Sequence, residues 1–69
     1  MEIKTDMAGL IESVLVSVGD VIEKGQKILL LEPMKTIMEV NSPSEGKVLE
    51  IKCESGDFVD EGDILVVLE

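Results

Sequence analysis

The chain has 69 residues, enough for one small domain that would bury only about 60 % of the surface its unfolded form exposes. Fifteen acidic residues against six lysines give a formal net charge of −9, which argues against nucleic acid or an anionic membrane as a partner. No apolar run approaches the length of a membrane span, and a single cysteine cannot form an internal disulfide, so we expect a cytoplasmic protein.

Short apolar runs separated by turn residues predict an all-β domain. A first strand is expected over residues 2–5, and helix signals are nearly absent. The sequence has one Phe and neither Trp nor Tyr, so its core must consist of Val, Ile, Leu and Met side chains, which suit strands. Many short strands with regularly spaced turns indicate a β-sandwich or a flattened β-barrel.

An internal repeat covers much of the chain. At an offset of 37 residues, residues 9–32 match residues 46–69 without a gap. The identical pairs are Gly9 and Gly46, Gly19 and Gly56, Asp20 and Asp57, Gly25 and Gly62, Leu31 and Leu68, and Glu32 and Glu69. Apolar character is repeated at Ile11 and Val48, Val14 and Ile51, Val16 and Cys53, Val21 and Phe58, Ile22 and Val59, and Ile28 and Leu65. One unit is too small to bury its apolar face, so we expect two halves packed on one pseudo-twofold core. Residues 1–8 and 33–45 are taken to lie outside the repeat.

Within each repeat we expect the elements in the order strand, turn, short extended segment, turn, strand. The glycines at the turns are interpreted as conformational, because glycine permits a positive φ. In the first strand of each unit, a step of three residues interrupts the alternation of apolar positions. We therefore expect a β-bulge or sharp twist between Ile11 and Val14 and between Val48 and Ile51.

The two halves are joined by a predicted β-hairpin. Apolar runs over residues 27–31 and 36–40 flank the stretch Glu32-Pro33-Met34-Lys35-Thr36, which places the tip at Met34-Lys35 and a return strand over residues 36–41. A two-residue hairpin loop normally requires Asn-Gly, Asp-Gly or Gly-X, and Met-Lys is none of these. A local rule broken in an otherwise consistent sequence suggests that this tip is kept for function.

Little self-contained chemistry is available. The absence of histidine excludes Ser/His and Cys/His catalytic arrangements and an ordinary zinc site. The acidic run over residues 57–63 has the oxygen ligands that calcium takes, but we interpret it as solvated turns because the matching run over residues 20–26 loses much of the charge. Cys53 and Phe58 are both expected in the core, since they match Val16 and Val21. We therefore expect no enzymatic activity of the chain itself.

Lys35, at the predicted hairpin tip, lies between the two repeat units and has no equivalent in either of them. The other lysines lie among carboxylates on expected strands or turns, whereas Lys35 would stand clear of the body. With its two glycine-marked halves and a Met-Lys pair between them, the whole chain, 1–69, resembles a single biotinyl/lipoyl attachment domain. It is most similar to biotin carboxyl carrier proteins. This resemblance implies a flattened barrel of two four-stranded antiparallel sheets, a barrel-sandwich hybrid, with the modified lysine on the hairpin between the halves.

The resemblance also implies site residues and a cofactor. Lys35 matches the attachment lysine, and Glu32, Pro33, Met34 and Thr36 are its expected neighbours in binding. Biotin sites of the family typically read Ala-Met-Lys-Met and lipoyl sites Asp-Lys-Ala, so Met34 favours biotin, while Pro33 and Thr36 depart from the pattern. The ungapped repeat leaves no room for the inserted thumb of many acetyl-CoA carboxylase carriers.

The implied function is that of a biotin carboxyl carrier. Its implied partners are a biotin protein ligase, a biotin carboxylase and a carboxyltransferase of a biotin-dependent carboxylase or decarboxylase. One alternative is a lipoyl carrier, which is disfavoured because no acidic residue directly precedes Lys35. The other is an unmodified barrel-sandwich interaction domain in which Lys35 is an ordinary exposed lysine.

Overall fold

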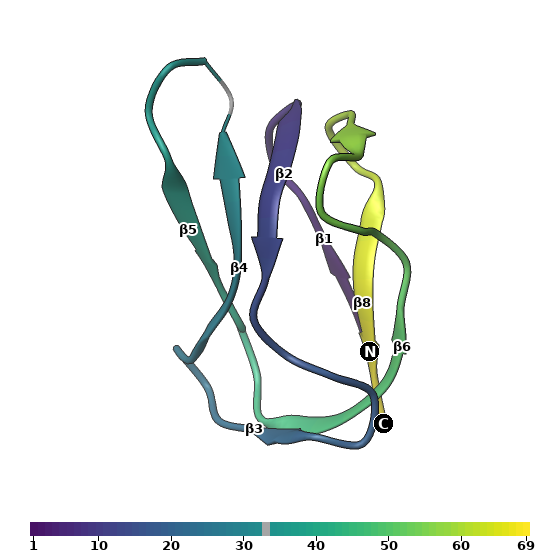
Figure 1. Ribbon diagram of the computed structural model, residues 1–69. Helices are drawn as coiled ribbons and strands as arrows, with labels where there is room; N and C mark the ends of the chain where they lie inside the picture. The colour runs from purple at the N-terminus through teal and green to yellow at the C-terminus, as the bar shows by residue number, and fades with distance from the viewer. Residues whose placement is uncertain (33) are drawn as a thin grey trace.

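Two four-stranded antiparallel sheets form the molecule, as predicted (Figure 1). The computed structural model describes residues 1–32 and 34–69, which contain no helix and hence none long and apolar enough to cross a membrane. The strands are β1 (Glu2–Lys4), β2 (Gly9–Val14), β3 (Val21–Ile22), β4 (Lys27–Glu32), β5 (Met38–Asn41), β6 (Gly46–Ile51), β7 (Phe58–Val59) and β8 (Ile64–Leu68). The molecule is elongated, with extents of 31 × 17 × 17 Å. The β4–β5 hairpin forms one end of it, and the N- and C-termini lie together away from the hairpin tip (Figure 1).

Each sheet is built from both halves of the chain. One sheet has the order β1-β8-β6-β3 and the other has the order β5-β4-β2-β7. Strands at the same place in the two orders are 37 residues apart in the sequence: β1 corresponds to β5, β8 to β4, β6 to β2 and β3 to β7. The pseudo-twofold relation therefore holds for all eight strands. Because β1 pairs with β8 and β7 pairs with β2, neither half completes a sheet without the other.

The repeat is therefore longer than the sequence comparison indicated. The assignment of residues 1–8 and 33–45 to segments outside it is wrong for β1 and β5, which occupy equivalent sheet edges. The turns that follow these strands are also equivalent. The Thr5 hydroxyl donates to the Met7 carbonyl and the Ser42 hydroxyl donates to the Ser44 carbonyl, and in each case the backbone N–H of the same acceptor residue donates back to the hydroxyl. The equivalent units are residues 1–32 and 38–69.

Glycine turns tie the two halves together. Gly19 and Gly56 have φ values of 95° and 96°, the conformation that the third position of a type II turn requires. The N–H of Gly19 donates to the carbonyl of Val48, and the N–H of Gly56 donates to the carbonyl of Ile11, both at 2.8 Å. Each turn is thus hydrogen-bonded to the opposite half of the chain, and the conformational interpretation of these glycines is confirmed.

Alanine at either of these glycines is expected to lower the free energy of unfolding by about 1–2 kcal/mol, because a Cβ disfavours the left-handed region. No atom lies within 4 Å of an added Cβ at Gly19 or Gly56, so the cost is conformational and not steric. Urea unfolding of Gly19→Ala and Gly56→Ala should give equal losses, since the two turns are equivalent. Unequal losses, or none, would contradict the conformational role.

The core lies between the sheets and repeats with the same offset. Its buried apolar residues are Ile11 and Val48, Val16 and Cys53, Ile22 and Val59, Ile28 and Leu65, Leu29 and Val66, Leu31 and Leu68, and Ile3. Removing this surface from water is the main favourable term in folding. Since nearly every member has its equivalent in the other half, the two repeats share one core.

Phe58 and Val21 are not in that core, which corrects the sequence-based expectation. Phe58 is 68 % exposed and Val21 is 77 % exposed. Each begins a two-residue strand whose other residue, Val59 or Ile22, points inward. Since successive side chains of a strand point to opposite faces, only one residue of each apolar pair can be buried.

Both expected bulges are present. The pairing of β2 with β4 shifts register between Ile11 and Ser13, and the pairing of β6 with β8 shifts between Val48 and Glu50. The shift lets apolar positions three residues apart face the same core. The first strand, expected over residues 2–5, is β1 over Glu2–Lys4.

Candidate functional site

The connection between β4 and β5 is longer than a two-residue turn. Among the described residues the last pair is Leu31 and Met38, and residues 34–37 lie between the strands. The expected tip at Met34-Lys35 and the return strand from Thr36 are therefore wrong in their bounds, because Thr36 and Ile37 belong to the connection. A connection of this length does not need the positive φ values that a two-residue hairpin turn requires. Accordingly, positive φ values in the described residues occur only at glycines, none of which lies in the connection.

Four of the five predicted site residues lie in the described part of the chain. Met34, Lys35 and Thr36 are consecutive and exposed, and the Met34 side chain is 84 % accessible. Glu32 is half-buried at the end of β4, opposite Leu10 of β2. Pro33 lies outside the described residues. The primary amine of Lys35 is thus carried on an exposed segment at one end of the molecule.

The strand that leads to this segment is firmly held. β4 is an inner strand, paired with β2 on one side and with β5 on the other. Ile28, Leu29 and Leu31 of β4 are at most 1 % exposed. The Lys27 amine also contacts the Glu39 carboxylate at 2.9 Å across the hairpin, although an exposed pair of this kind adds little stability. The connection therefore carries Lys35 on a rigid base.

The other candidate groups serve the turns and the core. The carboxylates of Asp57 and Asp63 accept hydrogen bonds from the backbone N–H groups of Glu54 and Asp60, both at 2.9 Å. The four acidic side chains of the run are accordingly exposed in or beside turns, as interpreted from the sequence, although the run also contains β7. Among the described residues, no group of three His, Cys, Asp or Glu side chains is placed to hold a metal ion.

Cys53 is a core residue, as expected. It is 4 % exposed, and its thiol lies 3.7 Å from the carbonyl oxygen of Leu65, to which it donates. Burial, with a smaller contribution from the charge of Asp57, raises the pKa of the thiol above its ordinary value. The reactive thiolate is therefore disfavoured in the folded protein.

This pKa shift predicts a pH dependence of stability. The folded pKa of Cys53 lies above the unfolded one, so above about pH 8.5 the unfolded chain loses the thiol proton first. We expect the free energy of unfolding to fall as the pH rises through this range. Cys53→Val, which introduces the residue at the equivalent position 16, should remove that part of the decrease. Urea unfolding of both proteins between about pH 7 and pH 10 measures the difference; parallel curves would contradict it.

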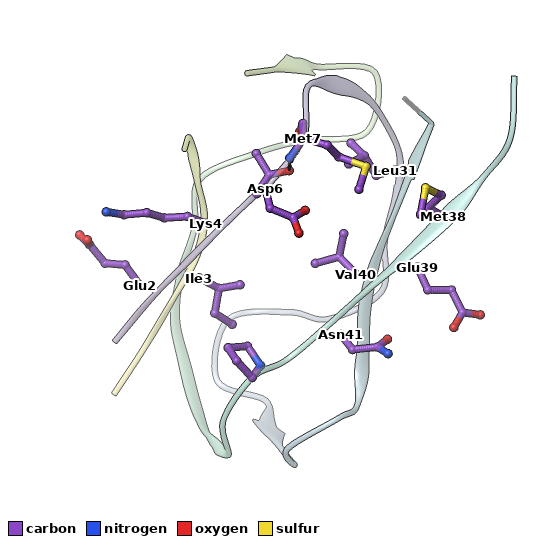
Figure 2. A pocket seen from close by; sticks show the side chains of 12 residues that line it. Glu2, Ile3, Lys4, Asp6, Met7, Leu31, Met38, Glu39, Val40 and Asn41 are labelled. Carbon is purple, nitrogen blue, oxygen red and sulfur yellow. Dashed lines mark hydrogen bonds between the residues drawn. The ribbon is translucent and has the colours of Figure 1, made fainter. Parts of the chain in front are cut away.

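A groove of about 410 Å³ opens between the equivalent edge strands β1 and β5 (Figure 2). The side chains of Ile3, Asp6 and Val40 point into it, whereas those of Glu39 and Asn41 point away (Figure 2). Met38, at the start of β5 and next to the connection, also lines the groove. Lys35 is not among the described residues that line the groove.

Sequence comparisons identify relatives of this fold and site. A family model described as biotin-requiring enzyme matches residues 1–68. The biotin/lipoyl attachment protein of Bacillus subtilis is 44 % identical over 68 residues, which cover 99 % of this chain and 93 % of that protein. Urea amidolyase of Saccharomyces cerevisiae is 49 % identical over 55 residues, 80 % of this chain but only 3 % of the enzyme.

Comparison with solved structures identifies the same family of domains as the sequence comparisons. The crystal structure of Kluyveromyces lactis urea carboxylase matches the whole chain with a TM-score of 0.92 and 32 % identity, over 6 % of its own length. The chain thus spans a small part of these large enzymes and nearly all of the Bacillus subtilis protein. The expected resemblance, the fold and biotin as the cofactor associated with the family are confirmed, and the chain belongs to the biotinyl/lipoyl attachment domain family.

Proposed function

We propose that this chain is a biotin carboxyl carrier that is covalently biotinylated at Lys35. The observation that supports this proposal most directly is the exposure of Lys35 on the connection between two equivalent halves. A loading enzyme must reach the side-chain amine, and an exposed segment at the end of an elongated molecule offers it without unfolding. Relatives that cover most of this chain include the biotin carboxyl carrier protein of acetyl-CoA carboxylase from Cyanidium caldarium, 42 % identical over 59 residues.

The loading step is an acyl transfer to Lys35. A biotin protein ligase activates the biotin carboxylate, whose oxygen attacks the α-phosphate of ATP; pyrophosphate leaves, and biotin is held as a mixed anhydride with AMP. Once the ammonium of Lys35 has lost a proton, its Nζ attacks the acyl carbon, a C–N bond forms and the C–O bond to AMP breaks. The attacking nitrogen then loses a second proton to give a neutral amide, and AMP leaves with the oxygen that had bridged it to the acyl carbon.

The residues around Lys35 fit such an attachment. Biotin, when bound, supplies a ring nitrogen that can take up and release a carboxyl group. The aliphatic stem of Lys35 provides a flexible arm, and β4 provides its rigid base. The neighbouring Met34 is exposed and adaptable, which suits contact with an apolar arm or with an enzyme surface. We retain Glu32, Pro33 and Thr36 as further contact residues.

The proposed role of the chain is physical and not catalytic. The tether keeps the carried group at a high effective concentration near a biotin carboxylase and a carboxyltransferase. The net charge of −9 would speed encounter with basic partner surfaces. Relatives include chains of propionyl-CoA carboxylase and urea amidolyase, so acceptor specificity is assigned to the transferase. We also propose a cytoplasmic location, since the one cysteine is a buried free thiol.

Intact mass spectrometry tests the proposal. The purified chain is incubated with biotin, ATP and a biotin protein ligase, and in parallel with lipoate, ATP and a lipoate ligase. We expect a mass gain of one biotinyl group in the first reaction and none in the second. A gain only with lipoate would support a lipoyl carrier, and no gain in either would support an unmodified interaction domain.

A further inference from the structure

Equivalent rows of side chains cross the two ends of the molecule, but they differ in chemistry. Near the hairpin, Leu10 of β2 lies between its register partners, Glu32 of β4 and Phe58 of β7. At the opposite end, the equivalent of Leu10 is Lys47 of β6, which pairs with Val21 of β3. The same position is therefore aliphatic at the hairpin end and charged at the other.

The row near the hairpin presents apolar surface to solvent. Leu10 is 38 % exposed and Phe58 is 68 % exposed, while the residues that follow them, Ile11 and Val59, are buried. Both exposed side chains thus lie on the outer face of the sheet. Neighbouring strands are about 4.8 Å apart, so Leu10 and Phe58 form one continuous patch.

This patch continues toward Lys35. Glu32, the partner of Leu10, is followed two residues later by Met34, which is 84 % exposed, and two residues span at most about 7 Å. We call Leu10, Phe58 and Met34 together the apolar flank. It lies beside the residue that the proposed function loads.

The fold explains why positions 10 and 58 face outward, but it does not require both side chains to be apolar. The equivalent strand pair at the other end has the same backbone arrangement with Lys47 in place of Leu10. Phe58 is the only aromatic residue of the chain, and most of its surface is exposed where burial would have stabilised the small core. Aromatic residues and Met are enriched in the centres of protein interfaces.

We propose that the apolar flank is the docking surface for the enzyme that acylates Lys35, an inference that rests on the proposed biotinylation. In that reaction the attacking atom is Nζ itself, which lies only about 6 Å from its own Cα. The enzyme must therefore bring its active site within one side-chain length of the connection. Its surface then covers the residues on either side, whereas enzymes that act at the far end of the loaded arm need not approach so closely.

The rim of the apolar flank defines the chemistry of this partner surface. Glu12 follows Leu10 on the outward face of β2, Asp57 precedes Phe58, and both are exposed. An apolar patch with an acidic rim fits a partner surface that is apolar at its centre and basic at its edge. Salt weakens such an encounter by screening the rim charges.

Steady-state loading kinetics test the docking surface. A purified biotin protein ligase is supplied with biotin and ATP, and the initial rate of biotinyl transfer is measured against the concentration of the unmodified chain. The test variant is Leu10→Ser/Phe58→Ser. The matched control is Val21→Ser/Leu49→Ser, which removes two exposed apolar side chains from the other sheet, Leu49 being 44 % exposed. Circular dichroism and urea unfolding verify that both variants are folded.

We expect the KM for the test variant to rise about tenfold or more while kcat at saturation is retained, because Lys35 and its connection are intact. The control should stay within about twofold of the unmodified chain. An unchanged KM for the test variant, or an equal rise in the KM of the control, would contradict the proposed docking surface. Neither result would contradict biotinylation of Lys35. Failure of the original chain to load would overturn both proposals.

Discussion

Arginine in place of Lys35 is expected to abolish biotinylation completely. The substitution keeps the positive charge and the approximate length of the side chain, but a guanidinium stays protonated in proteins and does not attack an acyl-adenylate. Because residue 35 is exposed in the connection between β4 and β5, the fold should be unchanged. Intact mass after incubation with biotin, ATP and the ligase measures the loss, and the circular dichroism spectrum checks the fold.

The matched control is Lys47→Arg, which makes the same chemical change at an exposed position on β6, away from the hairpin. This variant should gain one biotinyl group at the rate of the original chain, since nothing near Lys35 has changed. Labelling of the Lys35→Arg protein at a different lysine would show that the attachment site is wrongly assigned.

Truncation of the core is expected to have the largest effect on stability. Ile28 of β4 and Leu65 of β8 are equivalent residues, and both are fully buried. Replacing either with alanine leaves a cavity and should lower the free energy of unfolding by about 2–5 kcal/mol. The free energy of unfolding of a domain of this size is only about 3–10 kcal/mol, so each variant should lose a large part of its stability.

Urea unfolding followed by circular dichroism measures both losses. Since the sheets interleave strands from the two halves, Ile28→Ala and Leu65→Ala should each shift one single transition. Leu49→Ala, at a largely exposed position on β6, serves as the control and should stay within about 0.5 kcal/mol of the original chain. Two separate transitions in either core variant would contradict a shared core.

Periodic features of the fold follow from the amino-acid sequence alone. The glycine spacing predicted the equivalent turns, because a backbone with positive φ favours glycine. The step of three apolar residues from Ile11 to Val14 predicted the bulge, because alternation in a strand has a period of two. Burial of Cys53 followed from its match to Val16. All of these depend on local backbone geometry or on symmetry between the halves.

The extent of the repeat was also present in the sequence but missed. Met1 and Met38 are identical at the offset of 37, as are Glu2 and Glu39, and Ile3 matches Val40. The intervening turn residues are dissimilar, which hid the continuation. Only the pairing of β1 with β8 and of β5 with β4 made the equivalence evident.

Tertiary structure alone decided which apolar residues reach the surface and how the hairpin closes. Val21 and Ile22 look alike in the sequence, as do Phe58 and Val59, and the orientation of each short strand in its sheet determines which member of a pair is buried. The same holds at the hairpin, where Leu31 and Met38 form the last described pair and Lys35 lies exposed beyond it. Composition and periodicity describe what each segment prefers, whereas register and exposure arise from packing against strands distant in the sequence. This packing leaves Leu10 and Phe58 as exposed register partners on neighbouring strands.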